Sequence, residues 1–347
     1  MGLGRYVARR TVYIVILIFV IIVFNFFLFQ VLPFLVDCPH ESFNQCVTTL
    51  YVPITPPKGN ANATLILKHE REEVFNDYGF NSSIITRFGL YFRNMLTFNF
   101  GYNIGGVPGL SGSPVLSTIE IRAPFTILLL GLSTVLAFLI GIGLGVVAAA
   151  KRGRVLDISS LAVLLFLNAL PVFFLGAMLE LSQVSLTGTS YVGYSAGTVL
   201  ASGLGYYEAI LQSMFLPLVT LTLAGIGGVF LTQRAVMIDT VAEDYVLMAR
   251  AKGLPESTVL YKHAFRNAVL PIVTAFAISI GFILSGAVIT ETVFGWPGLG
   301  LAIYEGVVGV DFPLEQAMFF IITLMVLLCI FAADIIYGFL DPRVSVT

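Results

Sequence analysis

Residues Ala123–Ala150 read APFTILLLGLSTVLAFLIGIGLGVVAAA, with no charged side chain between Arg122 and Lys151. A helix needs roughly 20 apolar residues to cross the hydrocarbon core of a bilayer, so this stretch is long enough to span one. Over all 347 residues, 57% are hydrophobic and 11% are charged, whereas a soluble globular domain has roughly 25% charged residues. The sequence therefore predicts an all-α membrane protein.

The same test finds five further uncharged stretches, which together with the first predict a polytopic protein with six transmembrane helices. They are Thr11–Val36, Ile158–Leu179, Ala209–Gln233, Asn267–Thr290 and Gln316–Ala333. The uncharged residues Leu181–Tyr207 are rich in Ser, Thr and Gly and are expected to form a loop. Thr11–Val36 is too long for the hydrophobic region of a signal peptide, so we expect it to be retained.

The distribution of Lys and Arg predicts the orientation. Placing the N-terminus inside puts most basic residues on cytoplasmic loops, so both termini are expected in the cytoplasm of a cell-membrane protein. The chain then divides into an N-terminal helix (1–36), an external insert (37–122), a core with five helices (123–340) and a cytoplasmic tail (341–347). Two glycosylation sequons, at Asn62 and Asn81, fall in the external insert.

The external insert contains a cluster of Cys38, His40 and Cys46. A Cys38–Cys46 disulfide, two unpaired thiols and a metal site are all compatible with this cluster, although a metal site would lack a fourth ligand. Further along the insert, five apolar residues recur at helical spacing and predict one buried helix face: Ile84, Phe88, Tyr91, Phe92 and Met95.

The loop 237–266, between the fourth and fifth spans, is longer than a connection between two membrane helices requires. We predict a helix that ends at Lys252, a turn at Gly253 and a second helix opened by Pro255. Small residues at Ala249 and Ala251 would let another surface approach the backbone. The loop is thus either a helical elbow that docks on another protein or a solvated amphipathic loop.

Several motifs together resemble those of the first permease subunit of ABC importers of the dipeptide, oligopeptide and nickel family. They are ARAKG at Ala249–Gly253, His263–Pro271, ETVFGWPGLG at Glu291–Gly300, the C-terminal Asp341-Pro342-Arg343, Gly141–Lys151 and Asn168–Phe173. The sequence departs from the family pattern before the second span, where it has Asn99-Phe100-Gly101-Tyr102-Asn103.

The resemblance implies a type I ABC importer permease fold, with a second permease, two ATPase subunits and an external substrate-binding protein as partners. It implies that peptides are the substrate, with oligosaccharides or nickel as the alternative. It also assigns a group of residues to ATPase coupling: Tyr245, Ala249, Arg250, Ala251, Lys252, Gly253, Leu254, His263, Asn267 and Pro271. Lys252 or Arg250 would pair with acidic groups of the ATPase, whereas His263 and Asn267 would brace the elbow.

The Gly- and Pro-rich stretch Glu291–Gly300 cannot continue the fifth helix. By resemblance it is a re-entrant segment beside the translocation pathway, and the alternative is an ordinary outer loop. The pathway residues expected here are Glu291, Thr292, Phe294, Trp296, Pro297 and Gly298. The Gly141, Gly143 and Gly145 series either permits close helix packing or consists of ordinary membrane glycines.

Other functions are disfavoured by what the sequence lacks. It has no phosphate-binding GxxxxGK[ST] loop and no catalytic triad pattern. We therefore expect neither enzyme activity nor a cofactor in this chain, and we expect ATP to be hydrolysed by partner subunits. A net charge of −2 disfavours nucleic acid as a partner. A stand-alone secondary transporter would place ionisable residues within the spans, and the six stretches contain none.

Overall fold

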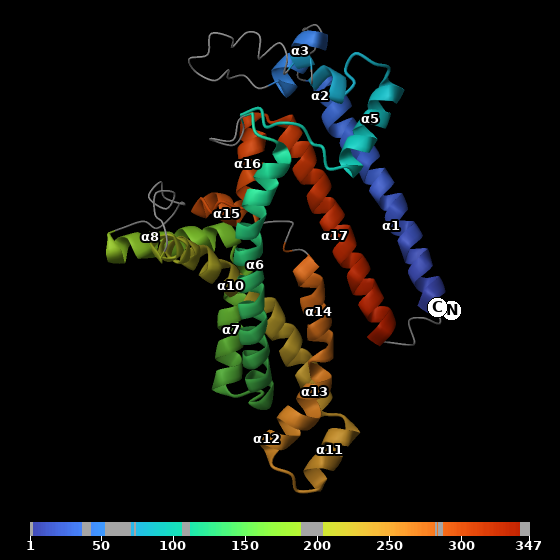
Figure 1. The fold of residues 1–347 in the computed structure, drawn as a ribbon. Helices are drawn as coiled ribbons and strands as arrows, with labels where there is room; N and C mark the ends of the chain where they lie inside the picture. Colours follow the sequence, from blue (N-terminus) through green and yellow to red (C-terminus); the bar gives the residue numbers. More distant parts are fainter. Residues whose placement is uncertain are drawn as a thin grey trace. The chain divides into compact units, whose positions relative to one another are not determined.

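A computed structural model describes residues 3–36, 43–52, 71–72, 74–105, 112–188, 204–281, 283 and 287–340. These residues are organised in helices that form two compact units. Unit 1 comprises Met1–Pro124 and Gly298–Thr347, and unit 2 comprises Phe125–Pro297. Helix α6 (Val115–Ala150) begins in unit 1 and continues into unit 2 (Figure 1).

Unit 1 contains the first and last predicted spans. The first is continuous through α1 (Leu3–Phe26), a π-helical turn η1 (Phe27–Val31) and α2 (Leu32–Val36). It packs along α17 (Phe312–Leu340), and α16 (Leu299–Gly309) packs on α17 as well. Large apolar side chains along α1 are exposed, such as Val15 at 60%. That exposure suits a helix that faces lipid, because its apolar side chains contact the hydrocarbon and its backbone hydrogen bonds are satisfied within the helix.

The insert between the first two spans adds α3 (Phe43–Tyr51) and α5 (Ile84–Leu96), which contact α17 and α1 respectively. The predicted buried face of α5 is confirmed at Tyr91 and Met95 but is wrong at Ile84, which is 59% exposed. Arg87, one turn further along α5, is buried although it is charged. Its guanidinium donates hydrogen bonds to Gln30 of the first span.

Unit 2 is built around α10 (Leu204–Val241), which packs against α7 (Val155–Ala169), α8 (Val172–Thr187) and α15 (Val288–Phe294). The predicted loop 181–207 is therefore wrong at both ends, because α8 runs to Thr187 and α10 begins at Leu204. After α10 come four short helical segments and α14: α11 (Asp244–Ala251), α12 (Glu256–Thr258), η2 (Val259–Ala264), α13 (Phe265–Ala268) and α14 (Leu270–Gly281).

Within the described residues, four helices are long and apolar enough to cross a membrane, and the number rises to six if each of two bent pairs is one span. The third predicted span is one such pair, because α7 and α8 meet at 103°. The backbone of Leu170 is extended (ψ 134°) immediately before Pro171, which disfavours helix at the preceding residue. The other pair is Glu256–Ala268 and Leu270–Ile280, bent by 48°. The fifth predicted span, Asn267–Thr290, overlaps this pair but extends past the end of α14 at Gly281.

Glycines set the contact between α6 and α10 in unit 2. A Cβ added at Gly141 would lie 2.8 Å from Cβ of Val229, and one added at Gly145 would lie 2.8 Å from Cβ of Gln233. Gly143 has open space around it. The three glycines were expected either to permit close helix packing or to be ordinary membrane glycines. Gly141 and Gly145 permit close packing, whereas Gly143 does not take part in it.

Candidate functional site

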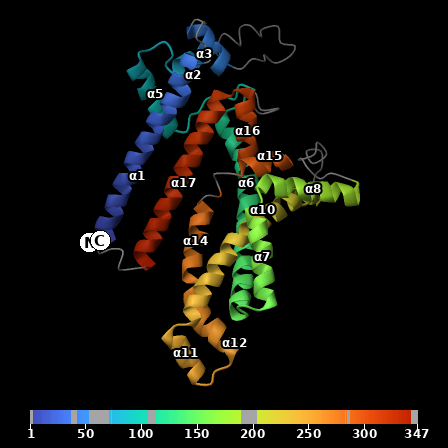
Figure 2. The ribbon, with the colours of Figure 1, turned by 180° about the vertical axis from the view of Figure 1, so that it is seen from behind.

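The segment Asp244–Ala268, called the elbow below, folds as the sequence predicts. Helix α11 ends at Ala251, and Gly253 has a φ of +75°, in the left-handed region that glycine adopts at little cost. Pro255 immediately precedes α12, where its extended backbone opens the second helix. In Figures 1 and 2 the elbow lies at one end of unit 2, away from α15.

The elbow is fixed to the rest of unit 2 by an apolar core. Val246 and Ala249 of α11 are buried together with Val146 of α6 and Met237 of α10, and the rest of the elbow adds Val259, Leu260, Ala264 and Ala268. Ala249 therefore packs against the chain itself, whereas Ala251 is exposed. Because these contacts join α11 to the ends of both long helices, a force applied to the elbow reaches α6 and α10 directly.

Two polar contacts hold the elbow in its bent form. The guanidinium of Arg250 donates to the carboxylate of Glu256, with its Nη2 at 2.7 Å from Oε1, and so joins the two sides of the Gly253 turn. The amide of Asn267 donates to the Tyr245 hydroxyl at 2.8 Å. This bond joins α13 to α11, and the bracing role of Asn267 stays a prediction. Arg250 is already paired within the chain, and its expected pairing with a partner protein stays a prediction.

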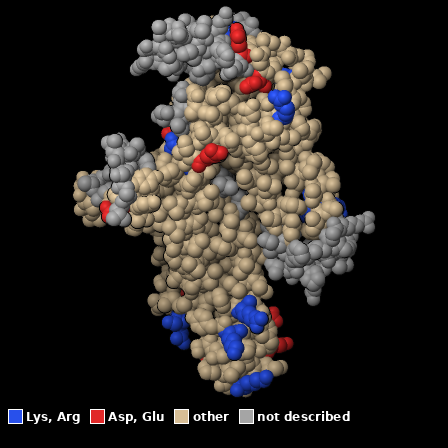
Figure 3. Space-filling model, viewed as in Figure 1, with Lys and Arg blue, Asp and Glu red and all other residues tan. Residues whose placement is uncertain are grey.

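The outer surface of the elbow combines apolar and basic side chains with the exposed acidic residues Asp244 and Glu256. Tyr245, Leu247, Met248 and Leu254 are 37–60% exposed. Around them lie the exposed basic residues Lys252, Lys262 and Arg266, and blue side chains gather on this end in Figure 3. A surface of this composition can bury its apolar centre against a protein and place its basic rim against acidic groups. His263 is half-buried and Pro271 lies in the first turn of α14.

The second predicted group breaks the helix as expected. Helix α15 ends at Phe294, Gly295 caps it with a φ of +59°, and α16 begins at Leu299. Thr292 is half-buried, whereas Pro297 and Gly298 are buried. The Phe294 ring packs on Gly176 of α8, where an added Cβ would lie 2.9 Å from the ring.

Glu291 and Trp296 both bind to α6. The hydroxyl of Thr126 donates to the Glu291 carboxylate at 3.0 Å, and Glu291 is fully buried. The Trp296 indole donates to the carbonyl oxygen of Phe125 at 3.0 Å and contacts the Phe125 ring. The two side chains therefore anchor the segment to α6, and a role in the translocation pathway stays a prediction. The structure does not bring these residues together with the elbow.

The predicted cysteine pair is only partly within the described residues. Cys46 is disulfide-bonded and is buried in a cluster with Leu50, Tyr51 and Phe80. Cys38 and His40 lie outside the described part of the chain, so the pairing of Cys46 with Cys38 stays a prediction. Among the residues that are described, no group of three His, Cys, Asp or Glu side chains could hold a metal ion.

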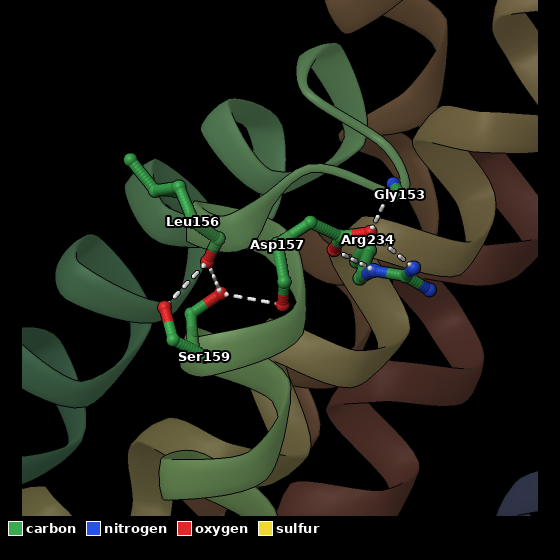
Figure 4. A network of polar contacts seen from close by, with 6 residues as sticks. Gly153, Leu156, Asp157, Ser159 and Arg234 are labelled. Carbon is green, nitrogen blue, oxygen red and sulfur yellow. Dashed lines mark hydrogen bonds and ion pairs between the residues drawn. The ribbon is translucent and has the colours of Figure 1, made fainter.

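Sequence reasoning missed an ion pair near the elbow. Asp157, in the first turn of α7, is 1% exposed and accepts two hydrogen bonds from Arg234 of α10, at 2.6 and 2.8 Å (Figure 4). It accepts a third from the backbone N–H of Gly153 at 2.9 Å. The two residues flank the predicted spans Ile158–Leu179 and Ala209–Gln233. Their separation of 77 positions gives no local signal of the pairing.

Comparison with known proteins identifies the family. Residues 141–346 match the family described as "Binding-protein-dependent transport system inner membrane component". The chain is 32% identical to the oligopeptide transport system permease protein AppB of Bacillus subtilis, over 81% of this chain and 86% of that protein.

Two further relatives cover still more of the chain. The metal-staphylopine import system permease protein CntB of Staphylococcus aureus is 33% identical over 86% of this chain and 88% of its own length. The dipeptide transport system permease protein DppB of Lactococcus lactis is 27% identical over 98% of this chain and 99% of its own length. With its apolar helices and its matching core, the chain belongs to the family of inner membrane components of binding-protein-dependent transport systems.

Proposed function

We propose that this chain is the permease subunit of an ATP-driven importer of peptides and that the elbow transmits the motion of a partner ATPase to the membrane helices. The observation that carries the proposal is the shared core in which Val246 and Ala249 of the elbow pack with Val146 and Met237 of the long helices. Because this core is closely packed, displacement of the elbow displaces α6 and α10 with it.

The partners and the orientation belong to the same proposal. The elbow and both termini face the cytoplasm, where two ATPase subunits bind the exposed apolar and basic surface around Met248 and Lys252. ATP is hydrolysed by those subunits rather than by this chain. A second permease completes the pathway, and an external binding protein delivers the substrate, as the family description implies.

Photo-crosslinking in the assembled complex tests the docking surface. A photoreactive amino acid at Met248, which is 60% exposed, is expected to capture an ATPase subunit. The matched control is the same probe at Ile85 in α5, which is 81% exposed and lies in the segment expected outside. Equal capture from both positions, or none from Met248, would contradict the docking proposal.

The substrate is tested by uptake into proteoliposomes that contain the complex, ATP and the binding protein. Peptide substrate is supported by relatives named for oligopeptides and dipeptides, whereas one relative is named for metal-staphylopine. We expect ATP-dependent uptake of labelled peptides. Uptake of labelled oligosaccharides or of a nickel complex, without peptide uptake, would assign the chain to the alternative substrate class.

A further inference from the structure

The Asp157–Arg234 ion pair is a bidentate contact at the end of the α7–α10 interface. The Asp157 Oδ1 accepts from Arg234 Nε at 2.6 Å, and Oδ2 accepts from Nη2 at 2.8 Å. Oδ2 also accepts from the N–H of Gly153, in the turn between α6 and α7. Asp157 stands in the first turn of α7, where the helix dipole favours a negative charge. One carboxylate thus joins α7, α10 and the α6–α7 turn.

Most of the rest of this interface is apolar, apart from Asn168 of α7, whose Cβ would lie 2.8 Å from a Cβ added at Gly227 of α10. Leu164 of α7 is buried in a cluster with Ile226 and Phe230 of α10, and Leu161 and Leu167 pack against that cluster. Apolar contacts hold the two helices together, but they contain no directional hydrogen bond. The paired, charge-assisted hydrogen bonds of an Arg–carboxylate contact have a fixed geometry. The ion pair therefore adds a directional contact to the packing that sets the axial register of α7 against α10.

Arg234 lies close to the elbow in the sequence and in the structure. It precedes Met237 by less than one turn of α10, and Met237 is part of the elbow core. The elbow core also includes Val146 of α6, whereas α7 contributes no residue to the described members of that core. Movement of the elbow therefore acts on α6 and α10 through apolar packing, and it reaches α7 through the contacts of α7 with those two helices.

We propose that Asp157 and Arg234 are positioning residues that make α7 move together with the elbow-bearing helix α10 during the transport cycle. This inference rests on the proposed function. Helix α7 continues through the bend at Pro171 into α8, and Gly176 of α8 touches Phe294 of α15. The pair thus stands at the start of a continuous set of contacts from the elbow to the α15 segment within unit 2.

The test compares ATP hydrolysis with substrate uptake in the reconstituted complex, using Asp157→Asn, Arg234→Gln and the double variant. Each single variant is expected to lower the amount of substrate transported per ATP hydrolysed about tenfold, within the range of coupling changes that single residues produce. ATP hydrolysis is expected to stay within about twofold of the unmodified complex. Arg154→Gln, a change at an exposed residue of the same turn, is the control and should leave both rates unchanged.

The double variant separates positioning from folding. It leaves no unpaired buried charge, so it is expected to reach the membrane at normal levels even if a single variant does not. Residues that act as one unit give non-additive effects, so its transport per ATP should fall no further than in the worse single variant.

A proportional loss of hydrolysis, uptake and protein level would show a purely structural pair and overturn the inference. The inference would also be overturned if the losses of transport per ATP in the two single variants added in the double variant. A normal amount of substrate transported per ATP in all three variants would overturn it as well. Absence of ATP-dependent uptake in the unmodified complex would instead refute the proposed function.

Discussion

The Thr126 hydroxyl on α6 donates a hydrogen bond of 3.0 Å to the carboxylate of Glu291 on α15. Both side chains are fully buried in unit 2. A buried carboxylate is stable only when hydrogen bonds replace the water it has lost. The contact therefore ties the short helix that follows α14 to the long helix α6, and it makes the α15 segment a fixed part of unit 2.

Removal of the Thr126 hydroxyl is expected to destabilise the protein. Thr126→Val keeps the shape of the side chain but removes the donor, which leaves Glu291 with one hydrogen bond fewer and should cost about 1–3 kcal/mol. The expected result is a lower midpoint of thermal unfolding in detergent. Thr126→Ser retains the donor and is the matched control. Equal midpoints for the Val and Ser variants would contradict the assigned role of the hydroxyl.

The α6–α10 contact predicts opposite outcomes at two neighbouring glycines. In Gly145→Ala the new Cβ would lie 2.8 Å from Cβ of Gln233 and 3.1 Å from the backbone nitrogen of Arg234. Because the helices must separate, this overpacking should cost about 1–3 kcal/mol. In Gly143→Ala the new methyl group meets open space, and the higher helix propensity of Ala should give up to ~1 kcal/mol of stability.

Thermal unfolding of the two alanine variants, measured side by side in the same detergent, checks this prediction. The order of midpoints should be Gly143→Ala, then the unmodified protein, then Gly145→Ala. If the Gly145→Ala variant were as stable as the Gly143→Ala variant, the result would contradict the close approach of α6 to α10 at Gly145.

The elbow turn depends on backbone conformation rather than on space. Gly253 has a φ of +75°, but nothing lies within 4 Å of a Cβ added there. Asn adopts the left-handed region several-fold more readily than other residues, whereas a β-branched residue is strained in it. We therefore expect Gly253→Asn to retain most uptake and Gly253→Val to lose it, with equal membrane insertion. Equal uptake by the two variants would show that the conformation of Gly253 is irrelevant to coupling.

Arg87 is expected to hold the insert of unit 1 to the first span. Its guanidinium donates to Gln30 Oε1 at 2.9 and 3.2 Å and lies 4.5 Å from the centre of the Phe80 ring. Burial lowers the pKa of Arg87 to about 10, so the side chain is charged at neutral pH and contributes charge-assisted hydrogen bonds.

Replacing Arg87 by Ala should cost about 1–3 kcal/mol of stability, because the buried oxygen atoms of Gln30 lose their charged donor. Limited proteolysis at neutral pH is expected to cleave the insert of the Arg87→Ala variant much faster than that of the unmodified protein. Arg93→Ala, a change at an exposed residue of the same helix, should have the protease resistance of the unmodified protein. Similar cleavage of both variants would contradict the anchoring role of Arg87.

The features predicted correctly from the sequence are those determined by short segments. The turn at Gly253 and the helix opened by Pro255 were predictable because the conformational limits of these residues act locally. The predicted third span is interrupted at Leu170 and Pro171, and the 103° angle there was not predicted. The loop assigned to 181–207 was wrong because composition alone does not reveal that a polar stretch extends two packed helices.

By itself the sequence determined that the chain crosses a membrane, where its helices lie approximately and that an elbow follows the fourth span. Hydrophobic run length and the special backbone of Gly and Pro need no knowledge of the rest of the fold. Only the tertiary structure decided that Asp157 meets Arg234 and that Arg87 reaches Gln30. Each pair joins residues distant in the chain, and only the packing of the intervening helices brings their charged and polar groups into contact.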